Sequence, residues 1–186
     1  MEVRSLGLCG VYEIIPKKFA DARGFLSETY ARDRFREIGI TQDWVQDNHS
    51  FSVDSGVLRG LHFQVSPFAQ DKLIRVLSGS VFDVAVDVRK TSPTFGRWVS
   101  LTISAAAFNQ MLIPKGFAHG FISLEPRTEV LYKVSAPYSK SCDRSISHAD
   151  PALAIAWPLP ADRRILSDKD RDAPLLASVI EECSFT

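Results

Sequence analysis

Short runs of β-branched, leucine and aromatic residues, separated by turn signals, dominate the middle of the chain. The runs are Lys72–Leu77, Val81–Val88, Trp98–Ile103, Gln110–Ile113 and Glu129–Val134. Gly, Pro, Ser and Thr residues stand between them, as in Ser78-Gly79-Ser80. Closely spaced strands joined by small turns are typical of an antiparallel sandwich or a closed barrel, and not of βαβ units. The pattern therefore predicts a mainly β fold.

Helical patterning is restricted to two segments. Arg32–Ile38 is a short charged stretch that ends at Gly39, and Pro174–Cys183 carries apolar residues at helical spacing. No repeat, linker or block of like charge divides the sequence. We therefore expect a single domain over residues 1–186 with a few short helices.

Composition narrows the class of protein. The 45% apolar and 24% charged residues match a globular protein, which excludes a disordered or collagen-like chain. Twenty-two basic and 22 acidic residues balance, which argues against a general nucleic-acid binder. No apolar run approaches the roughly 20 residues of a membrane span, and we expect neither a membrane segment nor a signal peptide. Cys9, Cys142 and Cys183 lie far apart and favour a reducing cytoplasm over a disulfide framework.

Candidate chemistry gathers between Gly60 and Ser123. The segments GLHFQ (60–64) and PKGFAHGF (114–121) have the spacing of the two cupin motifs. Metal-binding cupins carry two histidines and a glutamate in the first motif and a histidine in the second. Here His62 and His119 are kept, but Gln64 and Lys72 replace the other two ligands. Because a lysine ammonium repels a cation, we expect a cupin frame without a metal.

The polar residues that remain are suited to moving a proton. Two imidazoles, the Lys72 ammonium and the nearby Arg59 can together remove a proton and stabilise an oxyanion. No GxSxG elbow or catalytic-looking cysteine stands beside the histidines. The pattern therefore favours acid–base chemistry over covalent catalysis.

A set of longer segments resembles one enzyme family in order and spacing. The segments are DARGFLSET, QDNHS, VLRGLHFQ, QDKLIRV, FDVAVDVR, SPTFGRWV, IPKGFAHGF, EVLYKVSAPYS and ILSDKD. Over about residues 3–176 the chain resembles the dTDP-4-dehydrorhamnose 3,5-epimerases. This resemblance implies a cupin fold, a double-stranded β-helix or jelly-roll barrel, with neither metal nor redox cofactor.

The resemblance also implies a reaction. The family epimerises dTDP-4-dehydro-6-deoxy-D-glucose at C3 and C5 to dTDP-4-dehydro-L-rhamnose, for surface polysaccharides such as the lipopolysaccharide O-antigen. Both protons are acidic because both lie α to the C4 ketone. By resemblance, His62 is the base, Asp170 fixes its tautomer, and Lys72 offsets the charge on O4. Tyr132 matches the acid that reprotonates carbon from the opposite face, which turns proton exchange into inversion.

Binding residues follow from the same resemblance. Arg23 and Arg59 suit a pyrophosphate, and Tyr138 matches a tyrosine that stacks on thymine. The other positions that match ligand contacts, or lie beside them, are Phe25, Glu28, Gln46, Asn48, His119, Asp143 and Lys169. The family exchanges N-terminal strands across a homodimer, so we expect Arg23 and Glu28 to reach a neighbouring subunit's pocket.

Ordinary structural roles remain open for some of these residues. His119 can be a core histidine, Arg23 a surface ion-pair partner and Lys169 a solvated lysine. Asp168 and Asp172 are neighbouring alternatives to Asp170.

Four departures from the family pattern cluster on one loop, at Pro137, Asp143, Ser145 and His148. They leave the proposed proton-transfer residues unchanged, so they bear on the identity of the substrate and not on the chemistry. One alternative is a single-centre epimerase of another NDP-4-keto-6-deoxy sugar or NDP-keto-heptose. A metal-dependent oxygenase is disfavoured by Gln64 and Lys72, and a binding module without turnover is disfavoured by Tyr132.

Overall fold

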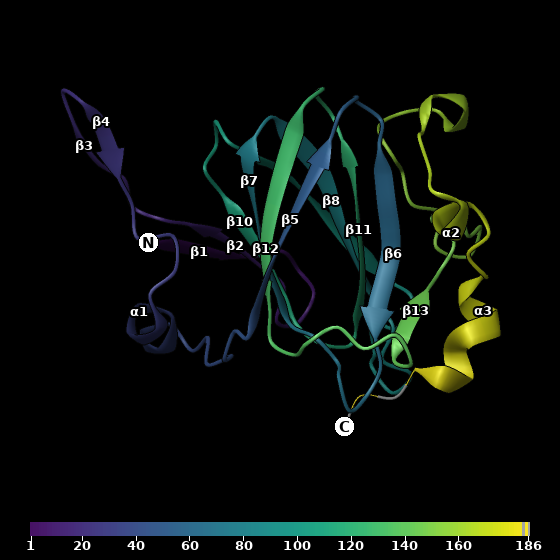
Figure 1. Cartoon of the computed structure of the whole chain (residues 1–186). Coiled ribbons are helices and arrows are strands. Elements are labelled where there is room, and N and C mark those ends of the chain that lie inside the picture. Colours follow the sequence, from purple (N-terminus) through teal and green to yellow (C-terminus); the bar gives the residue numbers. More distant parts are fainter. Residues whose placement is uncertain (184, 186) are drawn as a thin grey trace.

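Two antiparallel sheets face each other and form the body of the protein (Figure 1). The computed structural model describes residues 1–183 and 185. The first sheet has the order β1 (Glu2–Ser5), β2 (Tyr12–Ile15), β10 (Gln110–Ile113), β7 (Lys72–Ser78), β12 (Thr128–Val134) and β5 (Gln46–Ser52). The second has the order β13 (Asp143–Ser145), β6 (Leu58–Gln64), β11 (Phe117–Ser123), β8 (Ser80–Asp87) and β9 (Trp98–Ser104).

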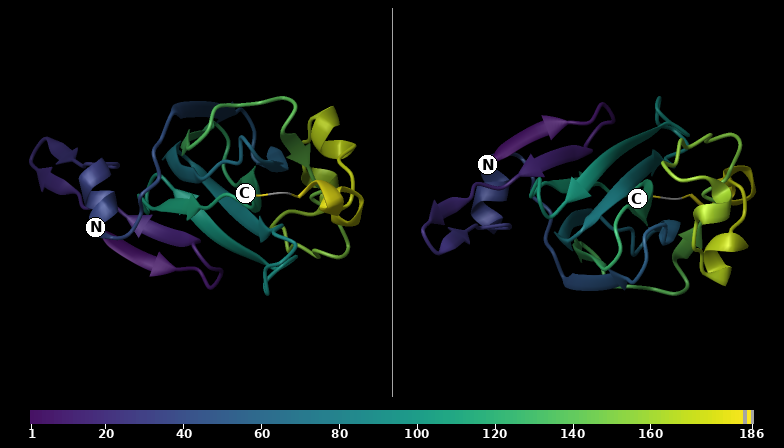
Figure 2. Two further views of the ribbon diagram at one scale, coloured as in Figure 1. Left: turned by 90° about the horizontal axis from the view of Figure 1, so that it is seen from below. Right: turned by 90° about the horizontal axis from the view of Figure 1, so that it is seen from above.

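The remaining elements lie at opposite ends of this body, as both views of Figure 2 show. At one end are a projecting hairpin of β3 (Phe19–Asp21) and β4 (Gly24–Leu26) and the helix α1 (Arg32–Glu37). At the other end are the helices α2 (Asp168–Arg171) and α3 (Leu176–Val179), with the 3₁₀ turns Ala161–Arg163 and Ile180–Glu182. Within the described chain, no helix is both long and apolar enough to span a bilayer.

The space between the sheets holds an apolar core. Ile74, Val76 and Val130 of the first sheet cluster with Ala85 and Phe121 of the second. Alternate residues of a strand point to opposite faces, so these side chains meet in the middle of the fold.

The other face of the second sheet is also covered. Leu153, Trp157 and Leu176 from the C-terminal segment pack with Leu61 and Val84 of the sheet. Every residue of β11 is therefore buried, because β11 lies inside the sheet and has protein on both faces.

The predicted mainly β fold is confirmed, and each predicted strand is present within a residue or two of its expected bounds. The two sheets face each other without joining into one continuous hydrogen-bonded barrel in the described chain. The predicted first helix is also found, and Gly39 follows it with a φ of +82° that favours glycine. The C-terminal helix is shorter than the expected Pro174–Cys183 and continues as a 3₁₀ turn.

Candidate active site

A cavity of about 400 Å³ lies between the two sheets. The strands β5, β7 and β12 form one wall, and β6 and β11 form the opposite wall. The side chains from the strands are Gln46, Asn48, Ser50, Arg59, His62, Phe63, Gln64, Lys72, His119, Phe121 and Tyr132. Strand β13 adds Asp143, and the loops and α2 add Gln70, Tyr138, Ser167, Lys169 and Asp170. Eleven of the 14 site residues predicted from sequence therefore line one cavity.

An irregularity in β6 brings Arg59 and His62 to the same cavity, although strict alternation would place them on opposite faces. The pairing of β6 with β11 shifts register next to Gly60, which has a φ of +122°. A Cβ at Gly60 would lie 2.5 Å from the Cα of Gly120, so a side chain there would force the strands apart.

His62 is paired with a buried carboxylate. Its Nε2 lies 2.7 Å from Oδ1 of Asp170 on α2. Ser167 caps this helix: its hydroxyl accepts from the Asp170 N–H (3.2 Å) and donates to Oδ2 (2.7 Å). The Gly60 N–H donates to Oδ1 at 3.3 Å. The carboxylate is thus held in one orientation towards the imidazole.

The same contacts keep Asp170 ionised. Burial alone would raise the pKa of this carboxyl, but the contacts with His62 and Ser167 outweigh burial and hold it below its usual value. An ionised Asp170 stabilises the imidazolium that forms when His62 takes a proton. The neighbouring Asp168 is exposed and pairs with Arg171, and Asp172 is exposed, so Asp170 is the aspartate that faces His62.

Lys72 lies deeper in the cavity and is only 7% exposed. Its ammonium donates to the His62 carbonyl at 3.3 Å. Burial lowers the pKa of Lys72 from 10.5 to about 8, and the negative charge of Asp83 limits the fall. The group is therefore a cation below pH 8 that lies close to the proposed base.

Asp83 is the residue that sequence reasoning missed. Its Oδ2 lies 2.9 Å from Nε2 of His119, both side chains are buried, and Oδ1 has no partner among the described residues. Burial lowers the pKa of His119 despite this neighbour. A neutral His119 that donates Nε2–H to Asp83 has only a lone pair left on Nδ1. Lys72, and not His119, is then the hydrogen-bond donor in this part of the cavity.

Tyr132 faces His62 from the other sheet, because it lies on β12 while His62 lies on β6. Burial raises the pKa of its phenol, although the positive charge of Arg59 opposes this. Tyr132 is therefore protonated at neutral pH and can donate a proton.

A second set of contacts surrounds Tyr138 at the cavity mouth. Its backbone N–H donates to Oε1 of Gln46 (3.3 Å), and its hydroxyl donates to Oδ2 of Asp143 (3.3 Å). The same carboxylate oxygen lies 2.5 Å from Nζ of Lys169. The ring of Tyr138 remains exposed and available to a ligand.

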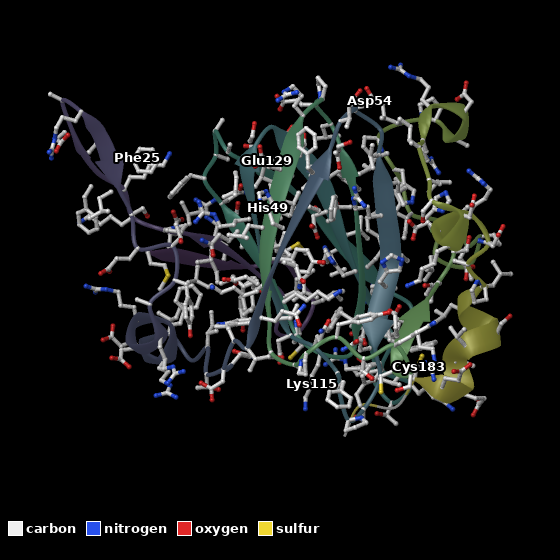
Figure 3. All side chains as sticks on the ribbon, in the orientation of Figure 1. Phe25, His49, Asp54, Lys115, Glu129 and Cys183 are labelled. Atoms are coloured by element: carbon white, nitrogen blue, oxygen red, sulfur yellow. The ribbon has the colours of Figure 1, made fainter. Side chains whose placement is uncertain are left out.

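Three predicted residues, Arg23, Phe25 and Glu28, do not line this cavity. Arg23 pairs with Asp21 and Glu28 pairs with Arg34. Figure 3 shows Phe25 on the projecting hairpin, away from β6. The chain's own arm does not bring these three residues to its own cavity.

Comparison with known proteins places this geometry in a family. The dTDP-4-dehydrorhamnose 3,5-epimerase family model matches residues 5–178. The chain belongs to the dTDP-4-dehydrorhamnose 3,5-epimerase family. The predicted family is thus confirmed, and with it an isomerase of the cupin-like fold.

Three relatives show how far the similarity extends. A dTDP-4-dehydrorhamnose 3,5-epimerase from Salmonella typhimurium is 52% identical over 162 residues, which is 87% of each chain. A dTDP-6-deoxy-D-glucose-3,5-epimerase from Legionella pneumophila, solved with dTDP-4-keto-L-rhamnose, has a TM-score of 0.93 and 44% identity over 99% of this chain and 97% of its own. A 3'-monoepimerase from Streptomyces bikiniensis, solved with dTDP-quinovose, has a TM-score of 0.87 and 33% identity over 95% and 89%.

Proposed function

We propose that the protein converts dTDP-4-dehydro-6-deoxy-D-glucose to dTDP-4-dehydro-L-rhamnose by inverting C3 and C5. The observation that carries this proposal is a base and an acid on opposite walls of one cavity: His62 with Asp170 on one side, Tyr132 on the other. The family of the chain supports the same activity.

The first half of the reaction removes a proton α to the C4 ketone. Because Nε2 of His62 lies against Asp170, Nδ1 is the ring nitrogen left to take the proton. Negative charge then develops on O4, and the Lys72 ammonium stabilises this enolate. Asp170 stabilises the imidazolium formed on His62.

The second half returns a proton from the other face of the sugar. Tyr132 donates from the facing sheet, so the carbon is inverted and not merely exchanged. C3 and C5 both flank the ketone, so the same base and acid serve both centres in turn, once His62 has lost its proton to solvent and Tyr132 has regained one.

The nucleotide end of the substrate lies at the cavity mouth. Tyr138 stacks on the base, and Arg59, an exposed residue that lines the cavity, pairs with the pyrophosphate. Asn48, Gln46 and Lys169 line the same cavity and contribute further polar groups for the nucleotide end.

The active form is a homodimer with exchanged arms. The β3–β4 hairpin exposes Phe25 (54%) and Leu26 (73%), an apolar surface that favours a protein partner. The side chain of Arg23 is 90% exposed at the hairpin turn. In an isologous dimer, each arm delivers Arg23 and Glu28 to the cavity of the other subunit.

We place the enzyme in the cytoplasm. Its three cysteines, Cys9, Cys142 and Cys183, are free thiols, as expected in a reducing compartment.

NMR of the keto-sugar nucleotide in D₂O tests the activity. We expect deuterium at both C3 and C5 and the L-rhamno product. Inversion of one centre alone would assign the chain to the single-centre epimerases. Binding without exchange at either carbon would make it a binding module. dTDP-glucose, which lacks the ketone, is the control and must show no exchange.

A further inference from the structure

Gln64, the last residue of β6, joins two loops through its side-chain amide. Nε2 donates to the carbonyls of Phe68 (2.7 Å) and Pro137 (3.1 Å), and Oε1 accepts from the Ser139 N–H (2.6 Å). The side chain is only 4% exposed. Gln64 stands where metal-binding cupins carry a histidine, and here it holds the chain on both sides of Tyr138.

The contacts of Tyr138 show how the hydrogen bonds of Gln64 can affect the position of the ring. The ring is 60% exposed, so the surrounding core does little to fix its direction. Three neighbouring backbone groups are held instead: the Pro137 carbonyl and Ser139 N–H by Gln64, and the Tyr138 N–H by Gln46. The path of the backbone, together with the contact of the hydroxyl with Asp143, therefore sets where the ring projects.

Amide chemistry excludes a direct donor role for Gln64, although it lines the cavity. A primary amide has two N–H donors, and both point to the carbonyls of Phe68 and Pro137. No N–H of this side chain is left for a substrate. Holding a loop in its binding conformation beforehand lowers the entropy cost of binding.

We infer that Gln64 is a positioning residue that sets Tyr138 for stacking on the nucleotide base. This inference rests on the proposed function, in which Tyr138 contacts the base. Gln64 then contributes to nucleotide affinity through Tyr138, with little effect on the proton-transfer step.

The test compares Gln64→Glu with the wild type by calorimetry with dTDP and by steady-state kinetics. Ionised glutamate keeps the shape and the acceptor for Ser139, loses both donors and adds a negative charge, and Gln64→Asn is the uncharged comparison for that charge. We expect Kd for dTDP and KM for the sugar nucleotide to rise about tenfold, the effect of losing two hydrogen bonds of ordinary strength, while kcat stays within about twofold. Gln64→Asn keeps the amide on a shorter arm and provides a second variant if Gln64→Glu does not fold.

A double-mutant cycle shows whether Gln64 acts through Tyr138. In a Tyr138→Ala background, Gln64→Glu is expected to weaken dTDP binding no further. Additive losses would overturn the inference, and so would an unchanged Kd in both Gln64 variants. Ile103→Val, a core change in β9, is the control for lost stability and must leave Kd unchanged.

Failure of the proposed function gives a different result. If Tyr138→Ala alone leaves the Kd for dTDP unchanged, Tyr138 does not stack on the base. That outcome removes the premise of the inference. If instead Tyr138→Ala weakens dTDP binding while Gln64→Glu binds dTDP as the wild type does, only the role of Gln64 is contradicted.

Discussion

His119 and Asp83 form a buried pair in which Nε2 lies 2.9 Å from Oδ2. The pair connects β11 to β8, where the backbone register sets His119 opposite Ala85, two residues after Asp83. Its charge also acts on Lys72, because the negative Asp83 raises the pKa of the ammonium while burial lowers it. Asp83 therefore affects the charge of Lys72 at the proposed oxyanion site, although Asp83 does not line the cavity.

Activity is expected to fall as the pH rises through about 8, where Lys72 loses its proton. The sign follows from the role of the group: the ammonium is present below this pKa and stabilises the enolate, and the neutral amine above it does not. The pH profile of kcat measures the effect. Lys72→Arg keeps the charge at all accessible pH values and is expected to remove this alkaline limb. A wild-type rate unchanged up to pH 9 would contradict the role of Lys72.

Asp83→Asn is expected to move the same alkaline limb to lower pH. Removing the negative charge takes away the influence that raises the pKa of Lys72, so the ammonium deprotonates earlier. The measurement is the pH profile of kcat/KM for both proteins. An alkaline limb at the wild-type position would mean that Asp83 only supports His119 structurally. Asp87→Asn, on the same strand but paired with Arg89, is the control and is expected to leave the limb in place.

His62→Ala and Tyr132→Phe are expected to separate the base from the acid. Without His62 no enolate forms, so both deuterium exchange and product fall by at least the roughly 10²–10⁴ of general base catalysis. With Tyr132→Phe, His62 still removes a proton and can return deuterium to the same face. Deuterium therefore enters recovered substrate while inverted product nearly vanishes, as NMR in D₂O would show.

Two results would contradict this division of labour. Inversion at the normal rate in Tyr132→Phe would assign the acid to water or another side chain. Loss of exchange as complete as in His62→Ala would mean that Tyr132 is needed to form the enolate itself.

Mixing two inactive proteins tests the exchanged arms. Arg23→Ala and His62→Ala subunits, once exchanged, form mixed dimers in which one cavity has both residues intact. Random pairing of equal amounts restores activity to about a quarter of the sites. His62→Ala mixed with Tyr132→Phe is the matched control, because both residues belong to the same subunit's cavity and no intact site can form. No recovery despite demonstrated exchange would mean that each subunit completes its own cavity.

The sequence was sufficient to find strands whose apolar pattern is continuous, such as β8, but not β6 or β11. Gly60 and Gly120 interrupt both strands at the place where their backbones approach closely, and polar residues of the cavity replace apolar ones there. The glycines and polar residues that shape the site therefore interrupt the apolar pattern by which these two strands would be predicted.

Asp83 could not have been assigned from sequence for a related reason. A single carboxylate in the apolar run VFDVAV gives no sign of its partner, and His119 lies 36 residues away. Only the pairing of β8 with β11 brings the two together. The resemblance pointed to Asp170 but left Asp168 and Asp172 as alternatives, and the cap at Ser167, which orients Asp170 towards His62, decides among them.

The separation of the two sheets has a consequence for how the rate responds to distant substitutions. The proposed base lies on one sheet and the proposed acid on the other, and no hydrogen-bonded ladder joins β5 to β6 in the described chain. The thickness of the apolar layer formed by residues such as Val76 and Phe121 therefore sets the distance between the base and the acid on either side of the sugar. A displacement of about 1 Å can cost roughly a hundredfold in rate. Substitutions in the core that change the spacing of the sheets are therefore expected to change kcat, although they do not touch the sugar.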